Sequence, residues 1–150
     1  MTALAHRMLP EAPFLARLRT ALRNPLSPVP LLVLRLPEFA EIAWRDGKPA
    51  ARRIERTTVR AFAAVAGRIM RDEDLLAHEA QSDWFAVAML SPSRASTAFA
   101  ATDARIALER IALAMCNETG RRMEWGRLTL ERAADLEDFA ATREHALVRG

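Results

Sequence analysis

The segment 74–90 constrains the fold of this chain more than any other part of the sequence. Two short apolar runs, at 75–77 and 84–90, stand on either side of a small polar turn around Gln81 and Ser82. This arrangement is typical of a β-hairpin, in which a tight turn joins two antiparallel strands. We therefore expect a β-sheet that contains this hairpin, and an all-helical bundle would contradict the pattern.

A second strand is predicted at 30–36. Its apolar run is nearly continuous and consists of Leu31, Leu32, Val33, Leu34 and Leu36. Such a run suits a central strand that is buried on both faces. Arg35 is the one charged residue inside it. Because a buried guanidinium needs a carboxylate partner or the end of the strand, we expect Arg35 to pair with Asp83 of the hairpin.

Helices are predicted around these strands. The first carries an apolar stripe at helical spacing, made of Phe14, Leu15, Leu18 and Leu22, and it stops near Pro25. A short helix at 38–44 ends at Asp46-Gly47, and a long helix covers about 50–71. The inner face of the long helix carries Ile54, Val59, Phe62, Val65, Ala66 and Ile69.

The last third of the chain adds a helix, a strand and a helix. The helix follows the break at 91–93, stops at Gly120, and is expected to bury one face made of Phe99, Ile106, Ala107, Leu113 and Ala114. Residues 122–130 alternate as a strand does, and 135–148 close the chain as a helix. Strands that enclose helices in this order predict an α+β fold, with a ferredoxin-like antiparallel sheet, packed helices and a preceding N-terminal helix.

Composition limits the classes of function. A length of 150 residues suits one domain, and the net charge of +3 is spread among alternating acids and arginines, so nucleic acid is not an expected partner. Cys116 is the only cysteine, the three histidines lack metal-ligand spacing, and no metal or cofactor is expected. No apolar run is long enough for a bilayer and no signal sequence is evident, so we expect a cytoplasmic protein without a membrane partner.

Three segments resemble GGDEF domains, the diguanylate cyclases. Residues 31–39 are similar to the family's first strand, which ends in Asp-x-Asp-x-Phe, and 44–48 to its Asn-Asp-x-x-Gly-His turn. The hairpin turn, 81–85, falls on Gly-Gly-Asp-Glu-Phe and reads Gln-Ser-Asp-Trp-Phe. The resemblance implies a nucleotidyl-cyclase fold in a single domain at 1–150, with an N-terminal helix and linker at 1–29 and a cyclase-like core at 30–150.

The sequence departs from the family at the positions that carry its chemistry. Arg35 stands where the family has a magnesium-binding aspartate, and a hard cation bound to phosphates is held by carboxylates. In the turn, Gln81, Ser82 and Trp84 replace two glycines and an acid, whereas Asp83 and Phe85 are retained. The polar residues by which the family recognises guanine correspond to Ala43 and Arg52. The resemblance therefore implies a degenerate domain without cyclase activity, and we expect a regulatory or protein-interaction module in bacterial signalling, with a protein partner or a second copy.

Two alternatives keep a nucleotide in the function. Arg71 and Asp74 fit the Arg-x-x-Asp pattern by which the family's cyclases bind cyclic di-GMP, and a guanidinium and a carboxylate can pair with the edges of guanine. Against this, Arg132 and Asp135 repeat the pattern by chance, and solvated charges at a helix C-terminus are the more ordinary explanation. The second alternative is a residual nucleotide-processing activity through Asp83.

Two further groups have competing interpretations. The three tryptophans, Trp44, Trp84 and Trp125, are more typical of core or rim positions than of an aromatic binding surface, but Trp84 follows the turn and is expected at an exposed tip as an interface anchor. Arg52, Arg53, Arg56 and Arg60 are either an anion-binding stripe or a solvated helix face.

Overall fold

The computed structural model describes residues 8–23, 28–90 and 98–146. Its centre is a five-stranded sheet in the order β1-β3-β4-β2-β5. The strands are β1 (Met8–Leu9), β2 (Val29–Arg35), β3 (Leu75–His78), β4 (Trp84–Ala88) and β5 (Glu124–Leu130). The helices are α1 (Glu11–Ala21), α2 (Glu38–Asp46), α3 (Lys48–Ile69), α5 (Ala98–Thr119) and α6 (Ala133–Ala146). Apart from β1, the predicted succession of helices and strands is confirmed.

The four long strands have the topology that the sequence predicts. β2 lies between β4 and β5 and pairs antiparallel with both, while β3 and β4 form the expected hairpin. This order is that of a split βαβ, ferredoxin-like sheet. β1, which the sequence did not predict, pairs parallel with β3 at Met8↔Leu76, so the sheet is mixed at that edge. Two residues are too few to show the alternation by which a strand is recognised.

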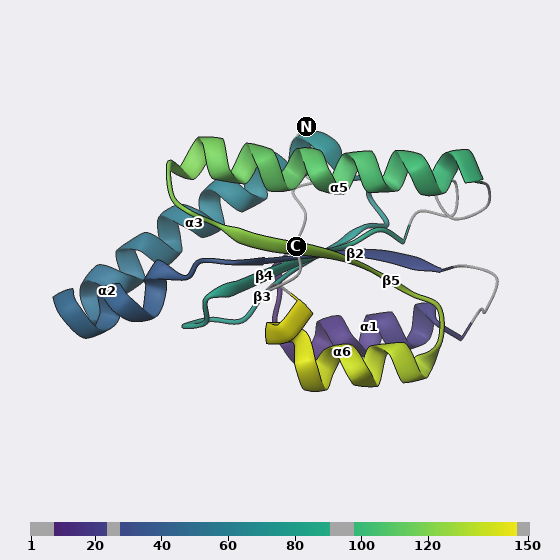
Figure 1. Cartoon of the computed structure of the whole chain (residues 1–150), viewed down its shortest axis with the longest axis horizontal. Helices are drawn as coiled ribbons and strands as arrows, with labels where there is room; N and C mark the ends of the chain where they lie inside the picture. Colours follow the sequence, from purple (N-terminus) through teal and green to yellow (C-terminus); the bar gives the residue numbers. More distant parts are fainter. Residues whose placement is uncertain (1–7, 24–27, 91–97, 147–150) are drawn as a thin grey trace.

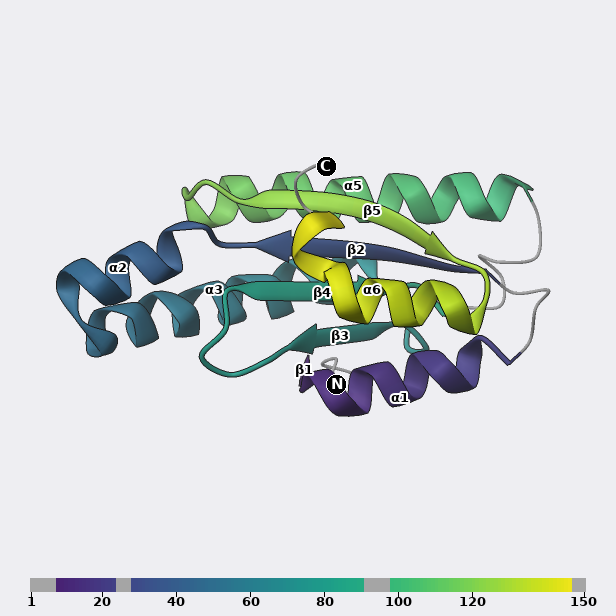
Figure 2. The ribbon, with the colours of Figure 1, turned by 60° about the horizontal axis from the view of Figure 1, so that its bottom comes forward.

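Helices cover both faces of the sheet. Figure 1 shows α3 and α5 on one face and α1 and α6 on the other, and the turned view in Figure 2 brings α1 and α6 forward. α2 and α3 follow each other through Gly47, whose φ of 92° is a backbone conformation that favours glycine. They form a helical hairpin that extends from one end of the sheet (Figure 2).

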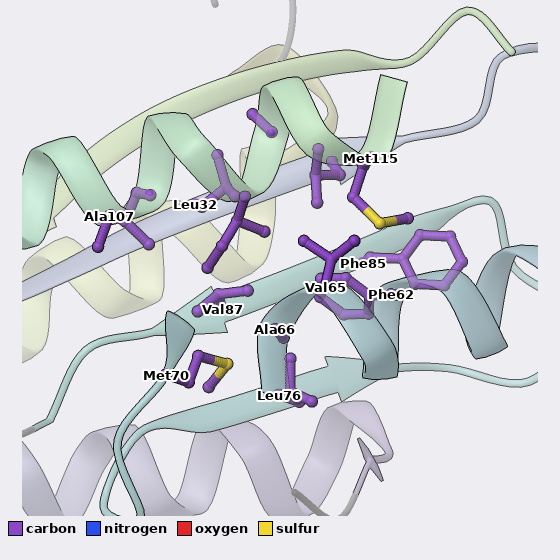
Figure 3. Close-up of a cluster of buried hydrophobic side chains, with 14 of the residues drawn as sticks. Leu32, Phe62, Val65, Ala66, Met70, Leu76, Phe85, Val87, Ala107 and Met115 are labelled. Carbon is purple, nitrogen blue, oxygen red and sulfur yellow. The ribbon is translucent and has the colours of Figure 1, made fainter. Parts of the chain in front are cut away.

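Each face of the sheet has its own core, because side chains alternate along a strand. In β2, Leu32 and Leu34 belong to the cluster under α3 and α5, whereas Leu31 and Val33 belong to the cluster under α1 and α6. Figure 3 shows the first cluster, in which α3, α5 and β4 supply most of the labelled side chains. β2 is therefore buried on both faces, as its continuous apolar run predicts.

The predicted inner face of α5 is right at Ala107, which is buried, and at Ala114, which packs against the core, but wrong at two larger residues. Ile106 and Leu113 are about half exposed, at 51% and 57%, and the helix instead buries Leu108, Ile111 and Met115. α5 is rich in alanine and apolar around most of its circumference, so spacing alone did not select the stripe that meets the sheet. The side chain of Phe99 and residues 147–148 of the closing helix lie outside the described part of the chain.

Within the described residues, no helix is both long and apolar enough to span a membrane.

Candidate functional site

The site begins with an ion pair at the end of β2. Arg35 is the last residue of the strand, and its Nε lies 2.7 Å from Oδ2 of Asp83 in the β3–β4 turn. A backbone hydrogen bond of 2.7 Å from the Leu36 amide to the Asp83 carbonyl fixes the same two segments. Both side chains are only partly exposed, at 34% and 25%. The pairing expected between Arg35 and Asp83 is confirmed.

This pair changes what the hairpin carboxylate can bind. A divalent cation that bridges phosphates is held by several oxygen ligands and attracted by unbalanced negative charge. The negative charge of Asp83 is not unbalanced, because the guanidinium of Arg35 lies at hydrogen-bond distance from its carboxylate. Among the described residues, no group of three or more His, Cys, Asp or Glu side chains is placed to hold a metal ion.

In the turn, Gln81 has a backbone conformation that is typical of glycine. Gln81 has a φ of 65°, and no other non-glycine residue in the described part of the chain has a positive φ. For residues other than glycine, this left-handed conformation costs about 1–2 kcal/mol. The first glycine of the Gly-Gly-Asp-Glu-Phe pattern falls on this position. The backbone therefore fits the resemblance even where the residue does not.

A buried polar cluster holds that turn in place. Nε2 of His78 lies 2.6 Å from Oε2 of Glu55 on α3, and the same oxygen accepts the amide hydrogen of Gln81 at 2.8 Å. The other ring nitrogen, Nδ1, lies 2.9 Å from the carbonyl of Trp84, which can only accept, so Nδ1 donates. The His78 ring also stacks on Phe85, with centroids 4.3 Å apart. Glu55 thus connects α3 to β3 and to the turn of the hairpin.

A second carboxylate ties the hairpin to α1. Oε1 of Glu79 accepts the amide hydrogen of Glu11 at 2.9 Å, at the first turn of α1, where free amide groups favour a negative charge. Ser82 closes the turn on itself, since its hydroxyl and its amide both donate to the Glu79 carbonyl. The turn is therefore held by hydrogen bonds to α1 and α3 as well as by hydrogen bonds within itself.

The prediction for Trp84 is wrong. Trp84 is 6% exposed and belongs to the core under α1 and α6, so it is not an exposed tip and cannot anchor a partner. It lies inside β4, directly opposite Arg35, and the alternation of the strand turns its side chain into that core. Trp125 is also packed against a core cluster, whereas Trp44 on α2 is 90% exposed.

Asp74 serves the backbone of its own loop. It is 3% exposed, and its two carboxylate oxygens accept the amide hydrogens of Arg71 and Leu90, each at 2.9 Å. The guanidinium of Arg71 points elsewhere, with Nη2 3.7 Å from Asp103 on α5. The structure thus places Arg71 and Asp74 in contact through the backbone of one residue and the side chain of the other.

The second Arg-x-x-Asp sequence adopts the same local structure. Asp135 accepts the amide hydrogens of Glu131 and Arg132, at 2.8 and 2.9 Å, and these two bonds lower the pKa of its carboxyl. In both places the aspartate amide also donates back to the arginine carbonyl, at 3.0 Å. The pattern is therefore, in this chain, a reciprocal cap of the backbone.

The remaining positions of the resemblance lie on the α2–α3 hairpin. Ala43 is on α2 and Arg52 is on the exposed side of α3, and neither offers the polar acceptors that a guanine edge requires. On the flank of α2, a hollow of about 330 Å³ is lined by Pro37, Glu38, Glu41, Ile42, Arg45 and Arg122. Its charges are paired, as in Arg121–Glu38 and Arg45–Glu41, so it offers no excess charge to a phosphate.

Sequence reasoning found the ion pair and missed the polar cluster. His78 and Glu55 are far apart in sequence, and neither lies in a recognisable motif. The one available signal was their position, because each is a titratable residue on a face that is otherwise apolar.

Comparisons with known proteins support the fold. Scans against models of protein families and against characterised proteins found no match. Among solved structures, the GGDEF domain of TpbB (YfiN) from Pseudomonas aeruginosa aligns over 98% of this chain and 87% of its own, with 22% identity and a TM-score of 0.66. The diguanylate cyclase SiaD of the same organism, in complex with its activator SiaC, aligns over 98% of this chain and 56% of its own, at 16% identity and a TM-score of 0.70.

LapD of Vibrio cholerae, as an S helix-GGDEF-EAL protein bound to cyclic di-GMP, aligns over 95% of this chain and 34% of its own, at 15% identity and a TM-score of 0.60. This chain therefore spans about half of SiaD and a third of LapD. The chain has the GGDEF-domain fold, which confirms the fold expected from the resemblance.

Proposed function

We propose that this chain is a non-catalytic GGDEF-fold domain that acts as a regulatory, protein-binding module in bacterial signalling. The observation that carries the proposal is the ion pair of Arg35 and Asp83. In a cyclase of this fold, phosphoryl transfer needs metal ions that neutralise the charge on the phosphates. Here a cation of the protein occupies the place of a metal ligand and balances the remaining carboxylate.

Other features of the site support the same proposal. The turn is closed by Ser82 and tied to α3 and α1 through Glu55 and Glu79, so little of its backbone is free to receive a phosphate. Regulation through protein contact has a precedent in the fold, since SiaD is bound to an activator protein. The activator is a partner of SiaD, and it supports a protein-binding role for this chain only by analogy of fold.

The test is a thermal-shift titration with GTP and Mg²⁺. A ligand that binds only the folded state raises the unfolding midpoint once its concentration exceeds its dissociation constant, and the rise then grows with the logarithm of the concentration. We expect no shift with millimolar Mg²⁺ and GTP together. An active diguanylate cyclase under the same conditions is the positive control. A midpoint that rises steadily with nucleotide concentration would contradict the proposal.

A variant makes the test sharper. Arg35→Asp places a second carboxylate next to Asp83, and the repulsion between them should lower stability without metal and be relieved by Mg²⁺. We therefore expect Mg²⁺ to raise the midpoint of Arg35→Asp but of neither the wild type nor Arg35→Asn. If all three respond alike, Arg35 does not block a cation site.

A cyclic di-GMP receptor is the second candidate, because LapD, which contains a GGDEF domain, is bound to that nucleotide. The local geometry gives it less support, since Asp74 is buried and both of its oxygens are engaged by backbone amides. Isothermal titration with cyclic di-GMP separates the two proposals. Saturable binding that is lost in Arg71→Ala would establish the receptor, and its absence would favour the protein-binding module.

A residual nucleotide-processing activity through Asp83 is the third candidate, and the same ion pair argues against it.

A further inference from the structure

The exposed side of α3 carries a row of arginines. Arg52, Arg56 and Arg60 recur every four residues, and Arg53 lies beside them. All four are exposed. Residues spaced by four lie above one another on a helix, and nine residues extend over about 12 Å. The four guanidinium groups thus form one continuous cationic face, which we call the arginine stripe.

Among the described residues, no carboxylate forms an ion pair with any member of the stripe. Other arginines on or near α3 do have such partners, because Arg68 pairs with Glu118 and Arg71 with Asp103. The single acid within α3 is Glu55, and it is turned away into the polar cluster with His78. The burial of this one carboxylate leaves the exposed side of the helix with positive charge only.

The same side of α3 continues with small side chains. Ala63, Ala64 and Gly67 are exposed and follow the stripe toward the C-terminal end of the helix. A Cβ added at Gly67 would meet no atom within 4 Å, so the surface there is open. A helix of another protein can approach such a surface closely while its acids reach the arginines.

A large exposed aromatic residue lies on the neighbouring helix. Trp44 is 90% exposed on α2, one helical turn before Gly47, where α3 follows. Arg52 lies about one turn beyond that joint. Tryptophan and arginine are the residues most enriched among interface anchors, and an exposed tryptophan contributes nothing to the core that would explain its presence.

We propose that the arginine stripe docks an acidic helix of a partner protein, with Trp44 as an adjacent apolar contact. This inference rests on the proposed function and names its surface. A protein fits better than nucleic acid, because the net charge is only +3 and the acids Asp72 and Glu73 follow the C-terminal end of α3. It also fits better than a lipid surface, which would require large apolar residues beside the cations, where this helix has alanines.

Charge reversal tests the surface against a matched control. Arg56→Glu/Arg60→Glu removes the centre of the stripe. Arg17→Glu/Arg23→Glu makes the same change of net charge at exposed arginines of α1 and its C-terminal end, on the opposite face of the sheet. The probe is a labelled helical peptide with glutamates every four residues, and its glutamine counterpart is the blank. Binding is measured by fluorescence anisotropy at physiological ionic strength, and thermal midpoints verify that both variants fold.

We expect the stripe variant to bind the glutamate peptide at least about tenfold more weakly than the wild type, and the control variant to stay within about threefold. Equal losses in the two variants, or no saturable binding by the wild type, would overturn the proposal. So would tighter binding of a single-stranded oligonucleotide or of phosphatidylserine vesicles than of the peptide. The GTP titration on the same protein separates the two proposals, since a domain that binds neither peptide nor GTP loses the surface and keeps the non-catalytic assignment.

Discussion

Arg35 at the end of β2 and Asp83 in the β3–β4 turn form an ion pair, with Nε and Oδ2 2.7 Å apart. The two residues are 48 positions apart in sequence. By the sequence resemblance, Arg35 corresponds to a magnesium-binding aspartate of GGDEF cyclases and Asp83 to an acid of their signature turn, and here the two pair with each other. The chemistry proposed for this domain follows from that replacement.

The strength of the pair can be measured by a double-mutant cycle. Because both side chains are partly exposed, solvent screens the attraction, and we expect a coupling free energy of about 0.5–1 kcal/mol. The variants are Arg35→Ala, Asp83→Ala and the double substitution, compared by urea unfolding. Additive effects would show that the two residues do not stabilise each other.

Gln81→Gly should stabilise the protein. Glycine tolerates the φ of 65° at this position, and the relief of strain exceeds the entropy that glycine adds to the unfolded chain, so we expect a gain of about 0.5–1 kcal/mol. Gln81→Ala is the control, because it removes the side chain and keeps the strain. A loss of stability in Gln81→Gly equal to that in Gln81→Ala would mean that the side chain, and not the backbone, determines this turn.

The most buried and the most exposed tryptophan should differ in how much they contribute to the free energy of unfolding. Trp84→Ala creates a cavity in the core under α1 and α6 and should cost about 3–5 kcal/mol of unfolding free energy. Trp44→Ala removes a side chain that is 90% exposed and should leave the unfolding free energy within about 0.5 kcal/mol. Urea unfolding of both variants checks the pair, and a large loss in Trp44→Ala would show that this residue belongs to the fold and not to a contact surface.

The sequence predicted the fold from patterns that depend on few competing choices. The continuous apolar run of β2 suits a strand that is buried on both faces, so no choice between faces was needed. The charge inside it, Arg35, required a partner, and Asp83 of the hairpin is that partner. Where several choices were equally apolar, prediction failed. α5 is apolar around most of its surface, and the sheet selected Leu108 and Ile111 in place of Ile106 and Leu113.

The error at Trp84 had a different physical origin. Its place after the turn suggested a tip, but β4 begins at that residue, and a register shift of one position moves a side chain from one face of a sheet to the other. The cluster of His78, Glu55 and Gln81 could not be predicted because it joins a helix to a turn through tertiary packing alone.

The two Arg-x-x-Asp sequences provide a prediction about binding and stability together. Asp74→Ala leaves the amide groups of Arg71 and Leu90 without acceptors in a buried place and should cost about 1–3 kcal/mol. Asp135→Ala exposes its two amides to water and should cost less. Thermal and urea unfolding of both variants measure the difference. An Asp74→Ala variant of unchanged stability would show that Asp74 is not a structural cap, and would return it to consideration as a ligand-binding residue.

A product assay tests most directly whether this domain lacks cyclase activity. The protein is incubated with GTP and either Mg²⁺ or Mn²⁺, and cyclic di-GMP is quantified by mass spectrometry beside an active diguanylate cyclase and a protein-free blank. We predict that product stays at the level of the blank with both metals, because Arg35 balances the charge of Asp83 that would help to hold a cation for phosphoryl transfer. Cyclic di-GMP formed in proportion to protein concentration, and abolished in Asp83→Ala, would contradict this prediction.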